Sequence, residues 1–125
     1  MNKKAKYKLN FRERLTSFKY AFQGLRHVLK AEHNFLIHLA AATAVIMLGA
    51  ILHISKAEWL IIILCIGMVL ITEILNTAIE WLVDMVSPQK NEKAGKIKDI
   101  SAAGVLIAAI VALVVGIVVF VPYIF

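Results

Sequence analysis

The chain has 125 residues, of which 61% are hydrophobic and only 18% are charged. Its apolar residues gather into runs longer than the helices of an ordinary soluble core, which argues against a soluble protein and leaves no room for a separate soluble catalytic domain. The single cysteine, Cys65, lies inside such a run, so a disulfide framework is excluded and redox chemistry is not expected.

The formal net charge of +6 is distributed around the apolar runs. Nine Lys and Arg residues precede the first run, one follows it, four lie between the second and third runs, and none follows the third. By the positive-inside rule, the N-terminus and the second loop are cytoplasmic, whereas the turn at Lys56 and the C-terminus face outward. The basic charge therefore predicts membrane topology, and we expect no nucleic-acid partner.

The N-terminal segment, residues 1–34, is predicted to be a cytoplasmic tail followed by an amphipathic surface helix. The lysines from Lys3 to Lys8 belong to the tail, and no secretory signal precedes the first apolar run. Apolar side chains then recur every three or four residues with basic residues between them, at Phe11, Leu15, Phe18, Phe22 and Leu25. Such a helix lies on a membrane surface, where it serves as an anchor.

Residues 35–125 are predicted to form one transmembrane domain of three helices, at about 35–55, 57–84 and 99–124. The turn before Lys56 is very short, so the first two helices are antiparallel neighbours. The second loop, about residues 85–98, contains the breaker Ser87-Pro88. Small residues within the spans favour close packing and an oligomer. The predicted fold class is an all-α membrane protein.

The end of the second span carries acidic residues at helical spacing. Glu73, Asn76, Glu80 and Asp84 fall within a stripe about 80° wide on a helix, so three carboxylates and one amide share a face. With Trp59 at the outer interface, the helical rise places Glu73 about 21 Å and Glu80 about 31 Å inward. Stacked carboxylates at this depth usually have a cation, a substrate or a proton to offset them.

The stripe predicts a site of lipid phosphorylation at the cytoplasmic face. A carboxylate at the inner boundary suits a general base for a lipid hydroxyl, and carboxylates nearer water suit Mg²⁺. Glu32, before the first span, and Lys98-Asp99, before the third, are expected at the same level, where the lysine adds a cation for phosphate. The alternative is a bundle in which these residues serve helix contacts and salt bridges alone.

Familiar nucleotide-binding motifs are absent, because the six glycines are scattered and no Walker lysine or kinase catalytic loop is present. Any nucleotide site must therefore be unconventional. His27, His33, His38 and His53 lack metal-ligand spacing with the cysteine, and each is expected at an interface or in packing.

The chain resembles the bacterial integral membrane diacylglycerol kinase family, and within it the undecaprenol kinase branch, over about residues 10–125. The most specific segments are residues 73–80, the pair Lys98-Asp99 with the following Ile100-Ser101-Ala102-Ala103-Gly104, and Glu32-His33-Asn34-Phe35. The resemblance implies a homotrimer in the bacterial cytoplasmic membrane. It also implies that ATP and Mg²⁺ bind at the cytoplasmic interface and that the lipid hydroxyl enters laterally from the bilayer.

The resemblance assigns roles to individual residues. The general base falls on Glu73, and the carboxylates that hold the metal and contact ATP fall on Glu32 and Glu80. Asn76 helps to position the reacting groups, and the pair Lys98-Asp99 contacts the phosphates.

Further nucleotide contacts are implied for Tyr20 and for Gln89, Lys90 and Asn91. The sequence departs from the diacylglycerol branch at Glu13, which stands where that branch has a nucleotide-binding arginine, so Arg12 or Arg14 could serve instead.

The assignment to the undecaprenol kinase branch depends on fewer residues than the resemblance to the family. Ala102 replaces a serine of the diacylglycerol branch near the lipid site, and Asn34-Phe35-Leu36-Ile37-His38-Leu39 resembles the undecaprenol branch, although Leu36 takes a position often held by arginine. The expected activity is transfer of the ATP γ-phosphoryl group to undecaprenol, giving undecaprenyl phosphate. The alternatives are a diacylglycerol kinase that makes phosphatidic acid and, more remotely, a small membrane transporter that uses Glu73 as its ion site.

Overall fold

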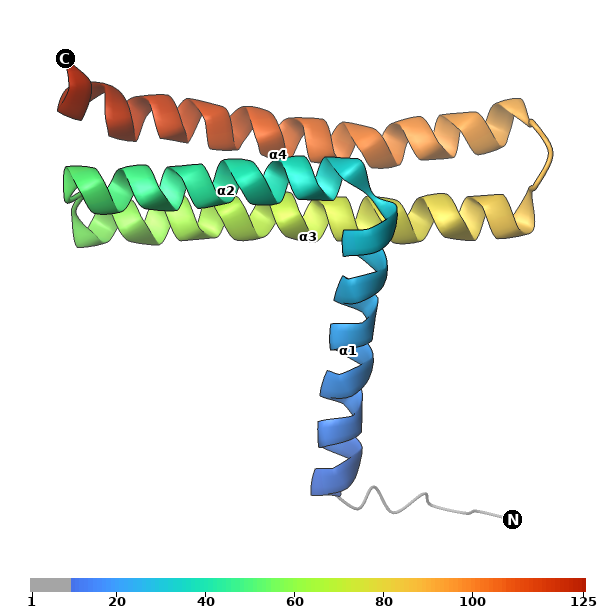
Figure 1. Cartoon of the computed structure of the whole chain (residues 1–125). Helices are drawn as coiled ribbons and strands as arrows, with labels where there is room; N and C mark the ends of the chain where they lie inside the picture. Colours follow the sequence, from blue (N-terminus) through green and yellow to red (C-terminus); the bar gives the residue numbers. More distant parts are fainter. Residues whose placement is uncertain (1–9) are drawn as a thin grey trace, which may run out of the picture.

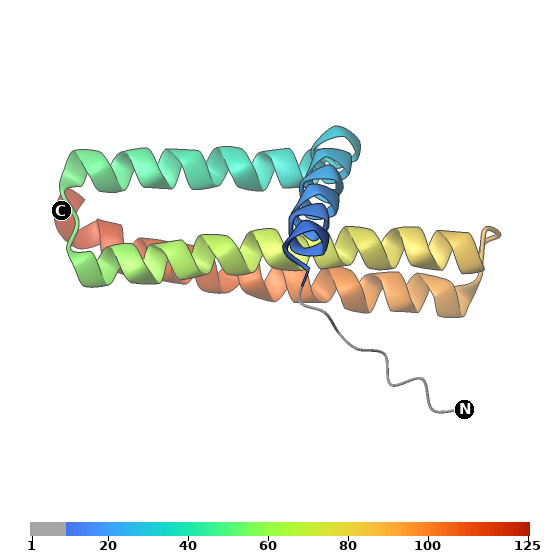
Figure 2. The ribbon, with the colours of Figure 1, turned by 90° about the horizontal axis from the view of Figure 1, so that it is seen from below.

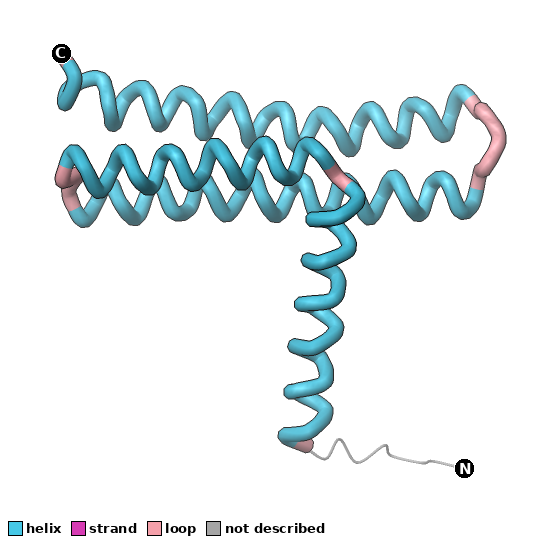
Figure 3. The backbone as a smooth tube through the Cα atoms, viewed as in Figure 1, coloured by secondary structure: helices cyan, strands magenta, loops and turns pink. Residues whose placement is uncertain are grey.

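The computed structural model describes residues 10–125, and the predicted tail from Lys3 to Lys8 lies outside them. Within this range the chain forms no strand and four helices, α1 (Phe11–Ala31), α2 (His33–Leu52), α3 (Lys56–Val86) and α4 (Glu92–Ile124). Figure 1 shows α2, α3 and α4 alongside one another, with α1 leaving them almost at a right angle. Figure 3 shows how short the connections are. The all-α architecture is confirmed.

Three of the helices, α2, α3 and α4, are long and apolar enough to cross a membrane, as predicted. They contain 20, 31 and 33 residues, which correspond to lengths of about 30, 46 and 50 Å. The hydrocarbon core of a bilayer is only ~30 Å thick. The excess length of α3 and α4 forms a hairpin that projects past the junction of α1 and α2, at the end away from the C-terminus (Figure 1).

Local side-chain contacts explain where the helices begin. Asn10 caps α1, since its side chain accepts a hydrogen bond from the amide of Arg12. Ser55 and Glu58 form a reciprocal capping box at the start of α3. At the junction of α1 and α2, Glu32 takes an extended conformation and makes no side-chain cap, so this single residue turns the chain by interrupting the helix.

The start of α4 differs from the sequence prediction. The helix begins at Glu92, seven residues before the predicted span at 99, and the loop covers only residues 87–91. The reason is Asn91, whose side-chain oxygen accepts hydrogen bonds from the amides of Lys93 and Ala94. Gly95 therefore lies inside the helix and does not break it.

The best-packed part of the chain is the end of the bundle that holds the C-terminus. Ile54, Ile62, Val119 and Phe120 form a buried cluster there. Trp59 covers Gly49 so closely that an added β-carbon would lie 2.9 Å from the indole ring. Elsewhere the three apolar helices expose large side chains, among them Leu64 and Ile100, both 73% exposed in the single chain. Lipid or further copies of the chain must cover these surfaces.

Candidate active site

The acidic stripe predicted on α3 is present, and its first part is buried. Glu73 is 2% exposed, Asn76 8% and Thr77 3%, and these are the buried polar or charged residues of the described chain. The Thr77 hydroxyl is satisfied within the helix, since it donates to the main-chain carbonyl of Glu73. Burying a carboxylate is costly unless another group offsets its charge, so the surroundings of Glu73 define the candidate site.

Three ionisable groups are close enough to act on the charge of Glu73. They are His38 of α2, Glu32 at the junction of α1 and α2, and Glu80 two turns along α3. The His38 Nε2 atom lies 3.6 Å from the Glu73 Oε2 atom, within ion-pair range. The two predicted metal-binding carboxylates thus lie within electrostatic range of the predicted base. The structure adds His38, which the sequence analysis had assigned to an interface or to packing.

The Asn76 side chain links the buried and exposed parts of the stripe. Its Nδ2 atom donates to Glu80 Oε1 at 3.4 Å, which is a weak contact. Its Oδ1 atom is buried and has no hydrogen-bond partner among the described residues. An orphaned buried acceptor costs about 1–3 kcal/mol, and a catalytic role or a bound water or ion is a common reason for one. Asn76 therefore presents a free acceptor one helical turn from Glu73.

The residues around Glu73 suit a hard divalent cation that also binds phosphate. Within the described residues, no group of three or more metal-binding side chains is preassembled. Mg²⁺ typically needs only one or two carboxylates, and it takes its other ligands from water and from substrate phosphates. Glu80 and Glu32 are half-buried, and the Glu32 carboxylate is not used to cap α2. Glu32 could thus supply oxygen ligands, and so could Glu80, whose Oε2 atom is not used in the contact with Asn76.

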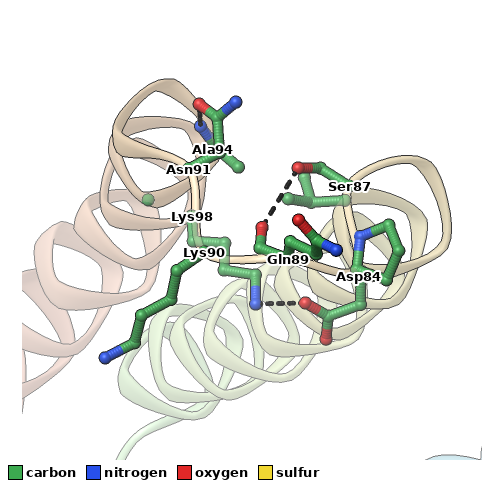
Figure 4. A pocket seen from close by; sticks show the side chains of 10 residues that line it. Asp84, Ser87, Gln89, Lys90, Asn91, Ala94 and Lys98 are labelled. Atoms are coloured by element: carbon green, nitrogen blue, oxygen red, sulfur yellow. Dashed lines mark hydrogen bonds and ion pairs between the residues drawn. The ribbon is translucent and has the colours of Figure 1, made fainter.

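A second polar cluster lies where the projecting hairpin turns. Lys98 of α4 forms an ion pair with Asp84 of α3, and both line a cavity of about 170 Å³ with Gln89, Lys90 and Asn91. Figure 4 shows Lys98 pointing toward Asp84 and Lys90 pointing away from both. The cavity thus gathers four of the predicted nucleotide contacts, although the Asn91 oxygen is already engaged as the cap of α4.

The remaining predicted site residues, Tyr20, Asp99 and Ala102, are exposed in the single chain. Tyr20 is 65% exposed on α1. Figure 1 shows that α1 leaves the bundle, whereas the loop between α3 and α4 lies at the end of the projecting hairpin. Asp99 and Ala102 are exposed on α4. The structure of one chain therefore does not assemble every residue that the resemblance assigned to nucleotide or lipid.

An apolar groove lies between α1 and α3, beside the buried stripe. It has a volume of about 490 Å³. Figure 2 shows α1 nearly end-on, running across from the start of α2 toward α3. The groove is lined by Ala21, Gly24, Leu25, His27 and Val28 of α1 and by Ile74, Thr77, Ala78 and Trp81 of α3. Small residues on both helices keep it open, and on α3 its lining residues begin directly after Glu73, at Ile74.

Comparison with known proteins shows which family the chain matches. Residues 19–120 match the family described as prokaryotic diacylglycerol kinase. The chain is 38% identical to the undecaprenol kinase of Bacillus subtilis over 85% of this chain and 86% of that one. It is 39% identical to a diacylglycerol kinase of Synechocystis, over 82% of this chain and 59% of that one. It is 34% identical to the diacylglycerol kinase of Escherichia coli K12, over 76% and 78% respectively.

Proposed function

The chain belongs to the prokaryotic diacylglycerol kinase family and is a lipid kinase with ATP as its phosphate donor, and from that premise we propose that it phosphorylates undecaprenol to undecaprenyl phosphate. The main support for this site is that Glu73 is buried and that the Asn76 oxygen, one turn away, has no hydrogen-bond partner among the described residues. Family membership leaves the transporter alternative without support.

Undecaprenol is proposed ahead of diacylglycerol on sequence features, namely Ala102 and the segment 34–39. Relatives of both kinds match the chain at similar identity: the Bacillus undecaprenol kinase is 38% identical over 86% of its length, and the Escherichia coli diacylglycerol kinase is 34% identical over 78% of its length. Diacylglycerol remains the runner-up substrate.

The lipid hydroxyl is activated by Glu73. Its carboxylate accepts the hydroxyl proton while the hydroxyl oxygen attacks the γ-phosphorus of ATP in line with the leaving ADP. The Asn76 side chain, one turn from Glu73 and with its Oδ1 unpartnered among the described residues, helps to position the reacting groups. Most of the rate gain comes from this positioning and from charge stabilisation.

The phosphates lie between the two polar clusters. Glu32 and Glu80 would hold Mg²⁺, which would neutralise phosphate charge when bound. Lys98 offsets the charge that develops during transfer, and the Asp84 ion pair keeps it at the mouth of the loop cavity. Gln89, Lys90 and Asn91 from the loop, with Asp99 and Tyr20, complete the proposed nucleotide contacts.

The lipid chain enters from the side through the groove between α1 and α3. The groove is apolar and is lined by residues of α1, including His27, and of α3, including Thr77. Another of its lining residues, Ile74, directly follows Glu73 in α3. With the N-terminus cytoplasmic and the C-terminus outside, α1 lies on the inner membrane surface as an amphipathic helix, so the groove opens toward the headgroup region.

We also propose a homotrimer in the bacterial cytoplasmic membrane. The exposed apolar faces of α3 and α4 offer surfaces for neighbouring copies, and Tyr20, distant from the loop of its own chain, could meet a nucleotide held by a neighbour.

The proposal is tested with purified protein in mixed micelles containing Mg²⁺ and radiolabelled ATP, offered undecaprenol and diacylglycerol in parallel. Labelled undecaprenyl phosphate as the main product supports it. Phosphatidic acid as the main product selects the runner-up, and the absence of labelled lipid from folded protein contradicts the proposed substrates.

A further inference from the structure

The general base proposed above is sealed from water, and this raises the question of where its proton goes. The Glu73 side chain is 2% exposed, whereas that of His38 is 24% exposed. The two side chains come from adjacent helices, and the His38 Nε2 atom lies 3.6 Å from the Glu73 Oε2 atom. That separation is longer than a hydrogen bond, but contacts of catalytic groups tighten when substrate binds. His38 is thus the less buried member of this close pair in the single chain.

The other ionisable groups around Glu73 are poorly suited to take its proton. On the described chain, the groups that act on Glu73 are His38 from α2, Glu32 from the junction of α1 and α2, and Glu80 from α3 itself. Both carboxylates are proposed to hold the cation, and a ligand carboxylate must stay deprotonated. An imidazole is neutral near physiological pH and can accept a proton there. His38 is the remaining acceptor.

We infer that His38 relays the proton from Glu73 to solvent after each phosphoryl transfer; this inference rests on the proposed kinase function. In the chemical step the lipid O–H bond breaks, the O–P bond forms, the bond from the γ-phosphorus to ADP breaks, and the proton passes to Glu73. That proton then passes to His38 Nε2, and the imidazolium releases a proton through its other ring nitrogen. Glu73 is again a carboxylate, ready for the next lipid. His38 acts through Glu73 and does not touch the reacting atoms.

Two substitutions separate a relay from a packing role. His38→Gln keeps a polar group near the position of Nε2 but cannot carry a proton. His38→Ala leaves a cavity that imidazole can enter from solution. His33→Gln is the matched control, because His33 is exposed in the first turn of the same helix.

The measurement is rapid-quench kinetics of label transfer from ATP to undecaprenol by the full-length protein in micelles. We expect both His38 variants to complete the first turnover within about twofold of the wild-type rate. Their steady-state rate should fall by about tenfold to a hundredfold, the scale of a lost proton-transfer group. Imidazole should restore the steady-state rate of His38→Ala but not of His38→Gln, and His33→Gln should behave as wild type.

Two results would overturn the relay. Wild-type steady-state turnover by His38→Gln would make His38 a packing residue. Equal loss in both kinetic phases, without rescue by imidazole, would make it a residue that merely orients Glu73. If wild-type protein itself labels no lipid, the kinase proposal fails first, and the relay fails with it.

Discussion

Lys98 of α4 and Asp84 of α3 form an ion pair that joins the two arms of the projecting hairpin, directly beside the loop cavity. Their side chains are 36% and 60% exposed, and exposed pairs contribute only ~0–1 kcal/mol to stability. The pair therefore matters more for where it holds the lysine than for the fold.

Asp84→Asn should free Lys98 from its counter-charge without unfolding the protein. Because the ion pair holds Lys98 beside the loop cavity, losing it should raise the KM for ATP severalfold, with kcat changed little. Steady-state kinetics at varied ATP concentration measures this. A lower KM would instead mean that Asp84 competes with the phosphate for Lys98. Glu92→Gln is a suitable control, since Glu92 pairs with Lys96 on the exposed side of the same hairpin.

Glu80→Gln should raise the Mg²⁺ concentration needed for half-maximal activity, because an amide is a weaker ligand for a hard cation than a carboxylate. Glu32→Gln should do the same. The check is a Mg²⁺ titration of label transfer at saturating ATP, with Glu13→Gln as the control on an exposed face of α1. An unchanged Mg²⁺ requirement in both variants would remove these carboxylates from the metal site.

Asn76→Leu should separate stability from activity. The substitution removes a buried oxygen that has no partner, so the protein should unfold at the same or a higher temperature, while the loss of the positioning acceptor should lower turnover by on the order of 10²-fold. Thermal unfolding and label transfer are measured on the same preparation. A variant that keeps the wild-type rate would show that the Asn76 oxygen has no role toward substrate, and a strongly destabilised variant would show that Asn76 stabilises the fold.

Gly49→Ala should destabilise the end of the bundle that holds the C-terminus. Its β-carbon would lie 2.9 Å from the ring of Trp59 and 3.1 Å from Ile54, and overpacking of this kind typically costs about 1–3 kcal/mol. Gly116→Ala is the control, because nothing lies within 4 Å of its added carbon. The measurement is the unfolding temperature in detergent. Equal values for the two variants would show that Trp59 moves aside freely.

Hydropathy and helical periodicity were sufficient to predict the three apolar helices and the stripe of Glu73, Asn76 and Glu80, because both depend on local sequence. The early start of α4 was missed because the prediction followed the apolar run, whereas the helix begins upstream of it at the Asn91 cap. An asparagine followed directly by Glu92 is a recognised N-cap pattern, and it could have signalled this start.

His38 was missed because its contact with Glu73 joins two helices. A signal was nevertheless present in the sequence. His38 lies 17 residues before Ser55, and Glu73 lies 18 residues after it. A hairpin that turns near Ser55 must therefore bring these two residues to the same depth, as the ion pair confirms. The pairing of Asp84 with Lys98, by contrast, was not predicted, because the loop between the two helices was expected to be longer than it is.

The most direct test of the central claim, that Glu73 is the general base, compares Glu73→Gln with wild type in label transfer from ATP to undecaprenol, alongside ATP binding by the same preparations. Removing the base should lower kcat by on the order of 10²- to 10⁴-fold while ATP affinity and the thermal unfolding of the protein stay close to wild type. A Glu73→Gln variant that transfers phosphate at the wild-type rate would contradict the claim.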